Sequence, residues 1–156
     1  MRDLKRQKIR IEFLWWIFTL VVVILVLLPI IRNVPEYPFY VENTYFIVAF
    51  ITFTRYIFLL PTTFIARAKW IKIFVIAIAA ILFFVMTTGL QDFHFYVVEK
   101  GLQSLVGHLH VEQQSRIIRY IQNEMIFFGV GSIISGIALP IRMIISLWRM
   151  RNRGTV

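Results

Sequence analysis

Histidine and carboxylate side chains, which are common metal ligands, gather between residues 92 and 112. His108 and His110 form a His-x-His pair, and Glu112 follows two residues later. Two histidines at this spacing face the same side only on an extended chain, whereas on a helix His108 aligns with Glu112. No third ligand follows at a compelling spacing. We therefore expect ordinary interfacial histidines and no cofactor, and keep His108, His110 and Glu112 only as weak candidates for a metal site.

Sequence motifs for nucleophilic or nucleotide chemistry are absent. The chain has no G-x-S-x-G, no glycine-rich phosphate loop and no H-E-x-x-H. It also has no cysteine, which excludes disulfides, thiolate metal sites and thiol nucleophiles. The sequence therefore indicates a protein that is not an enzyme. An enzyme acting on a lipid-phase substrate through the histidines is the last alternative, because no acid–base set is complete.

Arg55 is the sharpest feature, because it lies near the middle of an apolar segment. An arginine at the centre of a membrane span costs at least about 2.5–3.5 kcal/mol on insertion scales. No Asp or Glu lies in the core of any apolar segment to pair with it, while Thr52 falls near its helical face. Together with Arg142, near the end of another apolar segment, these residues are candidates to bind an anion, a lipid headgroup or a partner's carboxylate. The alternative is an arginine that snorkels or donates to backbone carbonyls inside the protein.

Four long apolar segments must position these residues. The chain has 156 residues and is 59% hydrophobic, against about 45–50% in a soluble domain. Each segment has about 19–24 residues, enough for a helix to cross a hydrocarbon core of ~30 Å. Backbone groups in lipid must be satisfied within the segment, which selects helices. We predict an all-α integral membrane protein, a four-helix bundle forming a single domain over residues 1–156, with spans at Phe13–Ile31, Thr44–Ile65, Ile71–Leu90 and Met125–Trp148.

The charged residues predict the orientation of these spans. Lys and Arg gather at the N-terminus, in the short connection between the second and third segments, and at the C-terminus, whereas Asp and Glu dominate the other connections. By the positive-inside rule, both termini face the cytoplasm and the protein is a multi-pass protein of the inner (plasma) membrane. This pattern accounts for most of the net charge of +9, so we expect no nucleic-acid partner. The basic residues on the predicted inner side are Arg2, Lys5, Arg6, Lys8, Arg10, Arg67, Lys69, Lys72, Arg149, Arg151 and Arg153.

The segment Gln91–Glu124 is the one sizeable piece outside the predicted spans. Apolar residues recur there at helical spacing after Asp92, a candidate N-cap, and Gly107 ends this pattern. A second helical pattern starts at Glu112 and runs without a breaker into the fourth span. We expect a small helical cap on the extracytoplasmic face.

The fourth span carries small residues at the spacing that lets helix backbones approach closely. Gly131 and Ser135 form one small-xxx-small pair, and Ser132 and Gly136 form another. Such a face packs against helices of the same bundle or against another subunit, and spacing alone does not separate these alternatives.

From these features the leading functional hypothesis is a non-enzymatic accessory or scaffold subunit of a membrane complex, or a homo-oligomer. Its partners would be membrane lipids and another protein chain. A small binding or transport protein that holds an anionic lipid or small anion at Arg55 is the alternative. A sensor-like membrane module without an attached output domain is a second alternative, on architectural grounds only. Ion-coupled transport is disfavoured, because no Asp, Glu or His lies within the spans.

Overall fold

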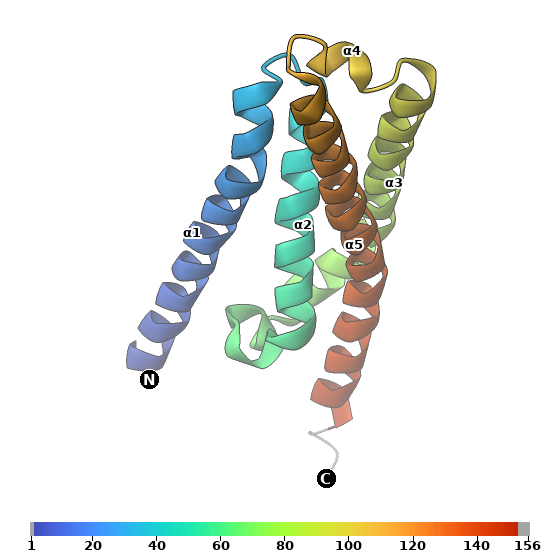
Figure 1. The fold of residues 1–156 in the computed structure, drawn as a ribbon. Coiled ribbons are helices and arrows are strands. Elements are labelled where there is room, and N and C mark those ends of the chain that lie inside the picture. Colours follow the sequence, from blue (N-terminus) through green and yellow to red (C-terminus); the bar gives the residue numbers. More distant parts are fainter. Residues whose placement is uncertain (1, 153–156) are drawn as a thin grey trace.

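The computed structural model describes residues 2–152, with the side chains of residues 2–5, 8, 64 and 67 excepted. The described chain is almost entirely helical and contains no strand (Figure 1). Two 3-10 turns, η1 and η2, connect the second and third helices. The elements are α1 (Arg2–Asn33), α2 (Tyr40–Phe58), η1 (Leu60–Thr62), η2 (Phe64–Arg67), α3 (Lys69–Glu99), α4 (Gln103–Val106) and α5 (Val111–Asn152).

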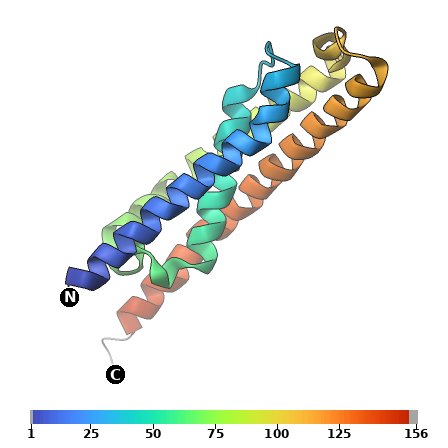
Figure 2. The same cartoon turned by 60° about the vertical axis from the view of Figure 1, so that its left-hand side comes forward.

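The four long helices run side by side, with α2 between α1 and α5 (Figure 1). The first and last described residues lie at the same end of the molecule, and the α1–α2 connection and α4 lie at the opposite end (Figures 1 and 2). We call these the terminal end and the α4 end. The Tyr120 hydroxyl of α5 donates to the Val26 carbonyl of α1 at 2.8 Å and ties these helices together.

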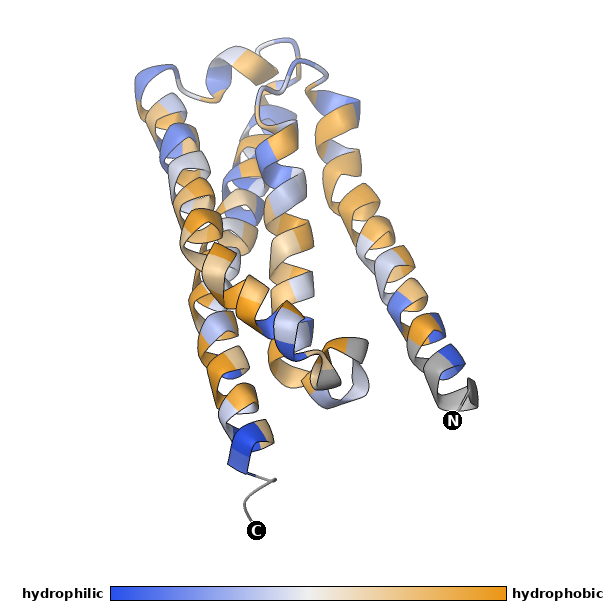
Figure 3. Cartoon of the chain, turned by 180° about the vertical axis from the view of Figure 1, so that it is seen from behind, coloured by the Kyte–Doolittle hydropathy of each residue, from blue (hydrophilic) through white to orange (hydrophobic). Residues whose placement is uncertain are grey.

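Three helices are long and apolar enough to cross a membrane. They are Ile9–Asn33, Lys69–Glu99 and Val111–Asn152. Large apolar side chains on their outer faces stay exposed, among them Phe13 at 66% and Phe84 at 69%. Hydrophobic residues dominate the middle of the helices, while hydrophilic residues gather near the ends (Figure 3). A broad exposed apolar surface of this kind is typical of a lipid-facing protein.

The second predicted span differs from the structure. The sequence predicts a helix over Thr44–Ile65, but α2 begins at Tyr40 and ends at Phe58. Pro61 has no backbone N–H to donate to the Ile57 carbonyl one turn earlier, so the α-helix ends before it and a 3-10 turn begins at Leu60. At 19 residues α2 is shorter than the other three long helices, and it contains Glu42, Asn43 and Arg55.

The core lies between α2, α3 and α5. Phe46 and Ile47 of α2 and Ile121 and Met125 of α5 are fully buried, and Met86 of α3 is 3% exposed. Burial of such large side chains fixes the relative positions of these three helices, while α1 adds Val23, Leu27 and Ile30 to the same cluster from one side.

The segment between the third and fourth predicted spans is more continuous than expected. The sequence analysis places a helix start at Asp92, but α3 continues through this residue to Glu99, because no helix breaker interrupts it. Gly101 then adopts φ +70°, a left-handed conformation that glycine accepts without steric cost and that is common just after a helix. The remaining separate cap element is the single turn α4, with Leu102 and Val106 buried against the core.

Candidate functional site

Arg55 forms a buried ion pair. Its Nη2 lies 2.8 Å from Oε2 of Glu12 on α1, and the two side chains are 5% and 12% exposed. The guanidinium also lies 5.3 Å from the ring centroids of Trp15 and Tyr56, within the range of cation–π attraction. The prediction that no carboxylate pairs with Arg55 is therefore wrong.

Two features of the fold explain this correction. Glu12 directly precedes the first predicted span, Phe13–Ile31, but α1 is helical from Arg2 onward and presents Glu12 to α2. Because α2 ends at Phe58, Arg55 occupies its last turn, near the terminal end, rather than the middle of a span. Thr52, one turn earlier, is partly buried, and no hydrogen bond joins it to the guanidinium among the described residues.

Two other cations lie near Arg55 at the terminal end. Lys72 is fully buried, and its Nζ donates to the Ala66 carbonyl at 2.5 Å and to the Ser146 hydroxyl at 2.9 Å. Arg142 donates through Nε to the Ile57 carbonyl at 3.0 Å. The Ala66 and Ile57 carbonyls lie in the last turns of η2 and α2, where backbone carbonyls lack helical partners and cations bind favourably. The acceptors are also neutral, so the hydrogen bonds do not balance the positive charges.

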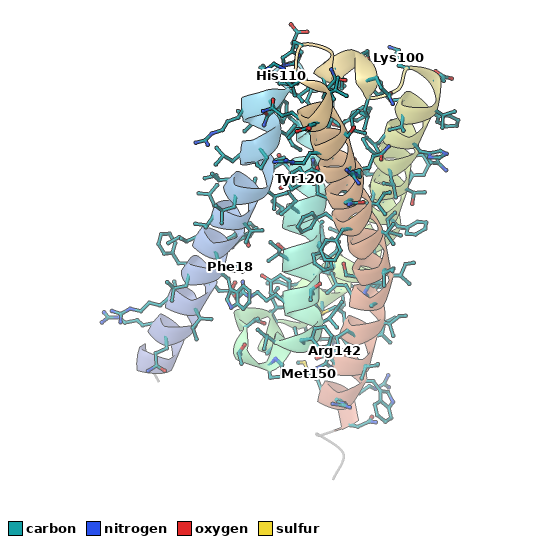
Figure 4. The ribbon with its side chains drawn as sticks, in the orientation of Figure 1. Phe18, Lys100, His110, Tyr120, Arg142 and Met150 are labelled. Atoms are coloured by element: carbon teal, nitrogen blue, oxygen red, sulfur yellow. The ribbon has the colours of Figure 1, made fainter. Side chains whose placement is uncertain are left out.

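A cavity of about 190 Å³, with both polar and apolar lining residues, opens beside these cations. Figure 4 shows Arg142 and Met150 next to the 3-10 turns at the terminal end, with His110 near the α4 end. The cavity is lined by Leu60, Pro61, Ala66, Arg142, Ser146, Arg149 and Met150.

A second buried polar cluster lies near the α4 end. Asn43 of α2 is fully buried and donates through Nδ2 to Oε1 of Glu124 on α5. The Tyr37 hydroxyl, also buried, has no hydrogen-bond partner within the described part of the chain, and the same holds for the second oxygen of Glu124. Burial, with the charges on Glu124 and Glu42, raises the pKa of Tyr37, so this phenol stays neutral.

The sequence analysis missed Glu124, although a signal was present. Glu124 follows Ile117 and Ile121 at helical spacing, so it falls on the apolar face of α5 that packs inward. A carboxylate on such a face needs a polar partner, and Asn43 supplies one.

The histidines do not gather around a common centre. The Nε2 of His108 lies 2.9 Å from the Asn33 carbonyl, which joins the α4–α5 connection to the end of α1. His110 and Glu112 are exposed at the start of α5. Within the described range, no group of three His, Asp or Glu side chains has the spacing needed to hold a metal ion.

The small residues of α5 face the other helices of this chain. A β-carbon at Gly131 would lie 2.8 Å from the Phe50 ring of α2, and one at Gly136 would contact Phe53 and Met86. Ser132 and Ser135 are buried, and their hydroxyls donate to carbonyls of α5 itself. The small side chains at these four positions thus allow α2 and α3 to pack closely against α5.

Comparison with models of known protein families, with curated proteins and with solved structures finds no match for this chain.

Proposed function

We propose that the chain is a four-span protein of the cell membrane, with both termini in the cytoplasm, that acts as a non-enzymatic accessory or scaffold subunit. Three helices have the length and composition of spans. The fourth span would be α2, which runs between the same two ends of the molecule with its polar residues turned inward. Asn43 and Arg55 are buried against partners, so α2 does not present them to lipid.

The charge distribution supports this orientation. Lys and Arg concentrate at the terminal end, and apart from Glu12 the carboxylates described in the structure lie toward the α4 end. A basic end on the cytoplasmic side follows the usual rule for membrane proteins.

The exposed N-terminal half of α1 is the observation that favours a subunit role. Figure 1 shows α1 diverging from α2 toward the terminal end, and Leu14, Ile17 and Phe18 are 62%, 43% and 51% exposed there. At this level Arg55 of α2 contacts α1 through the ion pair with Glu12 and through the Trp15 ring. A helix of another chain, or of a second copy, would find an extensive apolar surface on this half of α1.

Purification in mild detergent followed by native mass spectrometry tests this role. We expect a stoichiometric partner or a homo-oligomer, and Leu14→Ser/Phe18→Ser on α1 should dissociate it. The matched control is Phe84→Ser on α3, which changes an equally exposed apolar residue away from α1. A strictly monomeric protein without a stoichiometric partner would contradict the proposal.

The alternative of an anion held at Arg55 receives less support, because Glu12 already neutralises the guanidinium. The cations beside the 3-10 turns are a better place to look for anion binding.

A further inference from the structure

Two arginines face one cavity at the terminal end. Arg142, Ser146 and Arg149 follow one another at helical spacing on α5, so they share one face and line the cavity opposite Leu60 and Pro61 of η1. With about 190 Å³, the cavity has the space of about six water molecules at ~30 Å³ each. It is therefore large enough for a phosphate group.

A third cation lies directly beside this cavity. The Nζ of Lys72 is 2.9 Å from the Ser146 hydroxyl, which is part of the lining, and the positive charges of Lys72 and Arg142 repel each other. Buried and closely spaced cations are ordinarily balanced by an anion.

No carboxylate among the described side chains balances these three charges. Glu12 is the nearest candidate at this end of the molecule, and it is engaged with Arg55 on the other side of α2. The fold therefore concentrates positive charge around a preformed space that two arginines and a serine line.

We propose that this cavity binds a phosphate group, supplied by an anionic phospholipid of the adjoining leaflet or by free phosphate. A guanidinium donates two parallel hydrogen bonds to phosphate oxygens, so Arg142 and Arg149 are suited to this ligand. Met150 also lines a neighbouring apolar groove of about 490 Å³, together with Leu147 and Trp148. That groove gives an acyl chain a surface beside the headgroup site. The lipid source rests on the membrane location proposed above.

Arg149 and Arg151 form a matched pair for the test. Both are exposed, so Arg149→Gln and Arg151→Gln remove the same charge from the same helix turn without disturbing the core. Arg149 lines the cavity, whereas Arg151 borders the apolar groove, where an acyl chain offers no hydrogen-bond acceptor to its guanidinium. The affinity of the purified protein for short-chain phosphatidylglycerol, with phosphatidylcholine as reference, is measured in detergent.

We expect tighter binding of phosphatidylglycerol than of phosphatidylcholine, and a larger loss for Arg149→Gln than for Arg151→Gln. Both variants lose the long-range attraction between one arginine and the anionic lipid, which lowers the affinity of each by a similar factor. Direct hydrogen bonds to a charged group raise the affinity by a further factor of about ten or more, and only Arg149→Gln loses these bonds. Equal losses in the two variants, or no preference for the anionic lipid, would overturn the proposal.

Inorganic phosphate distinguishes the two sources. If it displaces phosphatidylglycerol from the wild-type protein, the cavity accepts free phosphate as well. If it does not, while the loss remains specific to Arg149→Gln, the site belongs to the lipid. These measurements need neither a partner chain nor a known topology, so their failure would leave the proposed subunit role standing.

Discussion

Removing one partner of the Glu12–Arg55 pair should destabilise the protein strongly. Glu12→Gln keeps the size of the side chain but removes its charge, which leaves the Arg55 guanidinium, 5% exposed, without a counter-charge. Breaking a buried ion pair in this way costs about 3–5 kcal/mol, because the remaining charge is desolvated without compensation. Glu12 is slightly more exposed, at 12%, so we expect the lower part of that range, about 3 kcal/mol.

A double variant distinguishes the loss of both charges from the exposure of one charge without its partner. Replacing both partners by apolar residues of similar size, Glu12→Leu/Arg55→Met, removes both buried charges and should cost far less than the sum of the single changes. The expected cost is within about 1 kcal/mol of wild type, since the cation–π contacts of Arg55 with Trp15 and Tyr56 are lost as well.

The assay is reversible unfolding of the purified protein in mixed micelles, followed by helical circular dichroism in a double-mutant cycle. Glu112→Gln is the control, because Glu112 is an exposed carboxylate, and its substitution should change the unfolding free energy by less than about 0.5 kcal/mol. If Glu12→Gln behaves like this control, or if the double variant equals the sum of the two singles, the pair does not hold α1 against α2.

Two further changes test the packing around α5. Glu124→Ala leaves the buried amide of Asn43 without its acceptor and should cost about 1–3 kcal/mol in the same unfolding assay, whereas full stability would show that water replaces the carboxylate. Gly131→Ala places a β-carbon 2.8 Å from the Phe50 ring, and the resulting overpacking should cost about 1–3 kcal/mol despite the better helix propensity of alanine. Phe50→Leu should relieve this cost, and Gly107→Ala, where the nearest atom is 3.7 Å away, is the control that should lose little. A stable Gly131→Ala variant would mean that α2 and α5 pack less closely than described.

The hydropathy of the sequence was sufficient to locate the long helices. Uninterrupted apolar runs predict α1, α3 and α5, because only helices satisfy the backbone in lipid. The end of α2 could also be predicted from the sequence, because Pro61 restricts its own backbone conformation and that of the residue before it. The predicted span Thr44–Ile65 nevertheless extends past Pro61, because a helix needs about 20 residues to cross the hydrocarbon core.

The partners of the buried charges were harder to predict. The sequence places Glu12 in a basic tail, and only the approach of α1 to α2 in three dimensions shows that it meets Arg55. Lys72 was assigned to a cytoplasmic connection, yet it is fully buried between α3 and α5. Such contacts depend on the angle and rotation of packed helices, which local patterns do not specify.

The central claim is that all four long helices cross the membrane, α2 included. The chain has no cysteine, so single cysteines can be introduced and labelled with a membrane-impermeant maleimide in intact cells and after lysis. Four exposed positions report on the ends of the helices: Glu36, Thr62, Ser104 and Arg151. We predict labelling of Glu36→Cys and Ser104→Cys in intact cells, and of Thr62→Cys and Arg151→Cys only after lysis. Labelling of Glu36→Cys and Thr62→Cys from the same side would show that α2 does not span the membrane and would contradict the account.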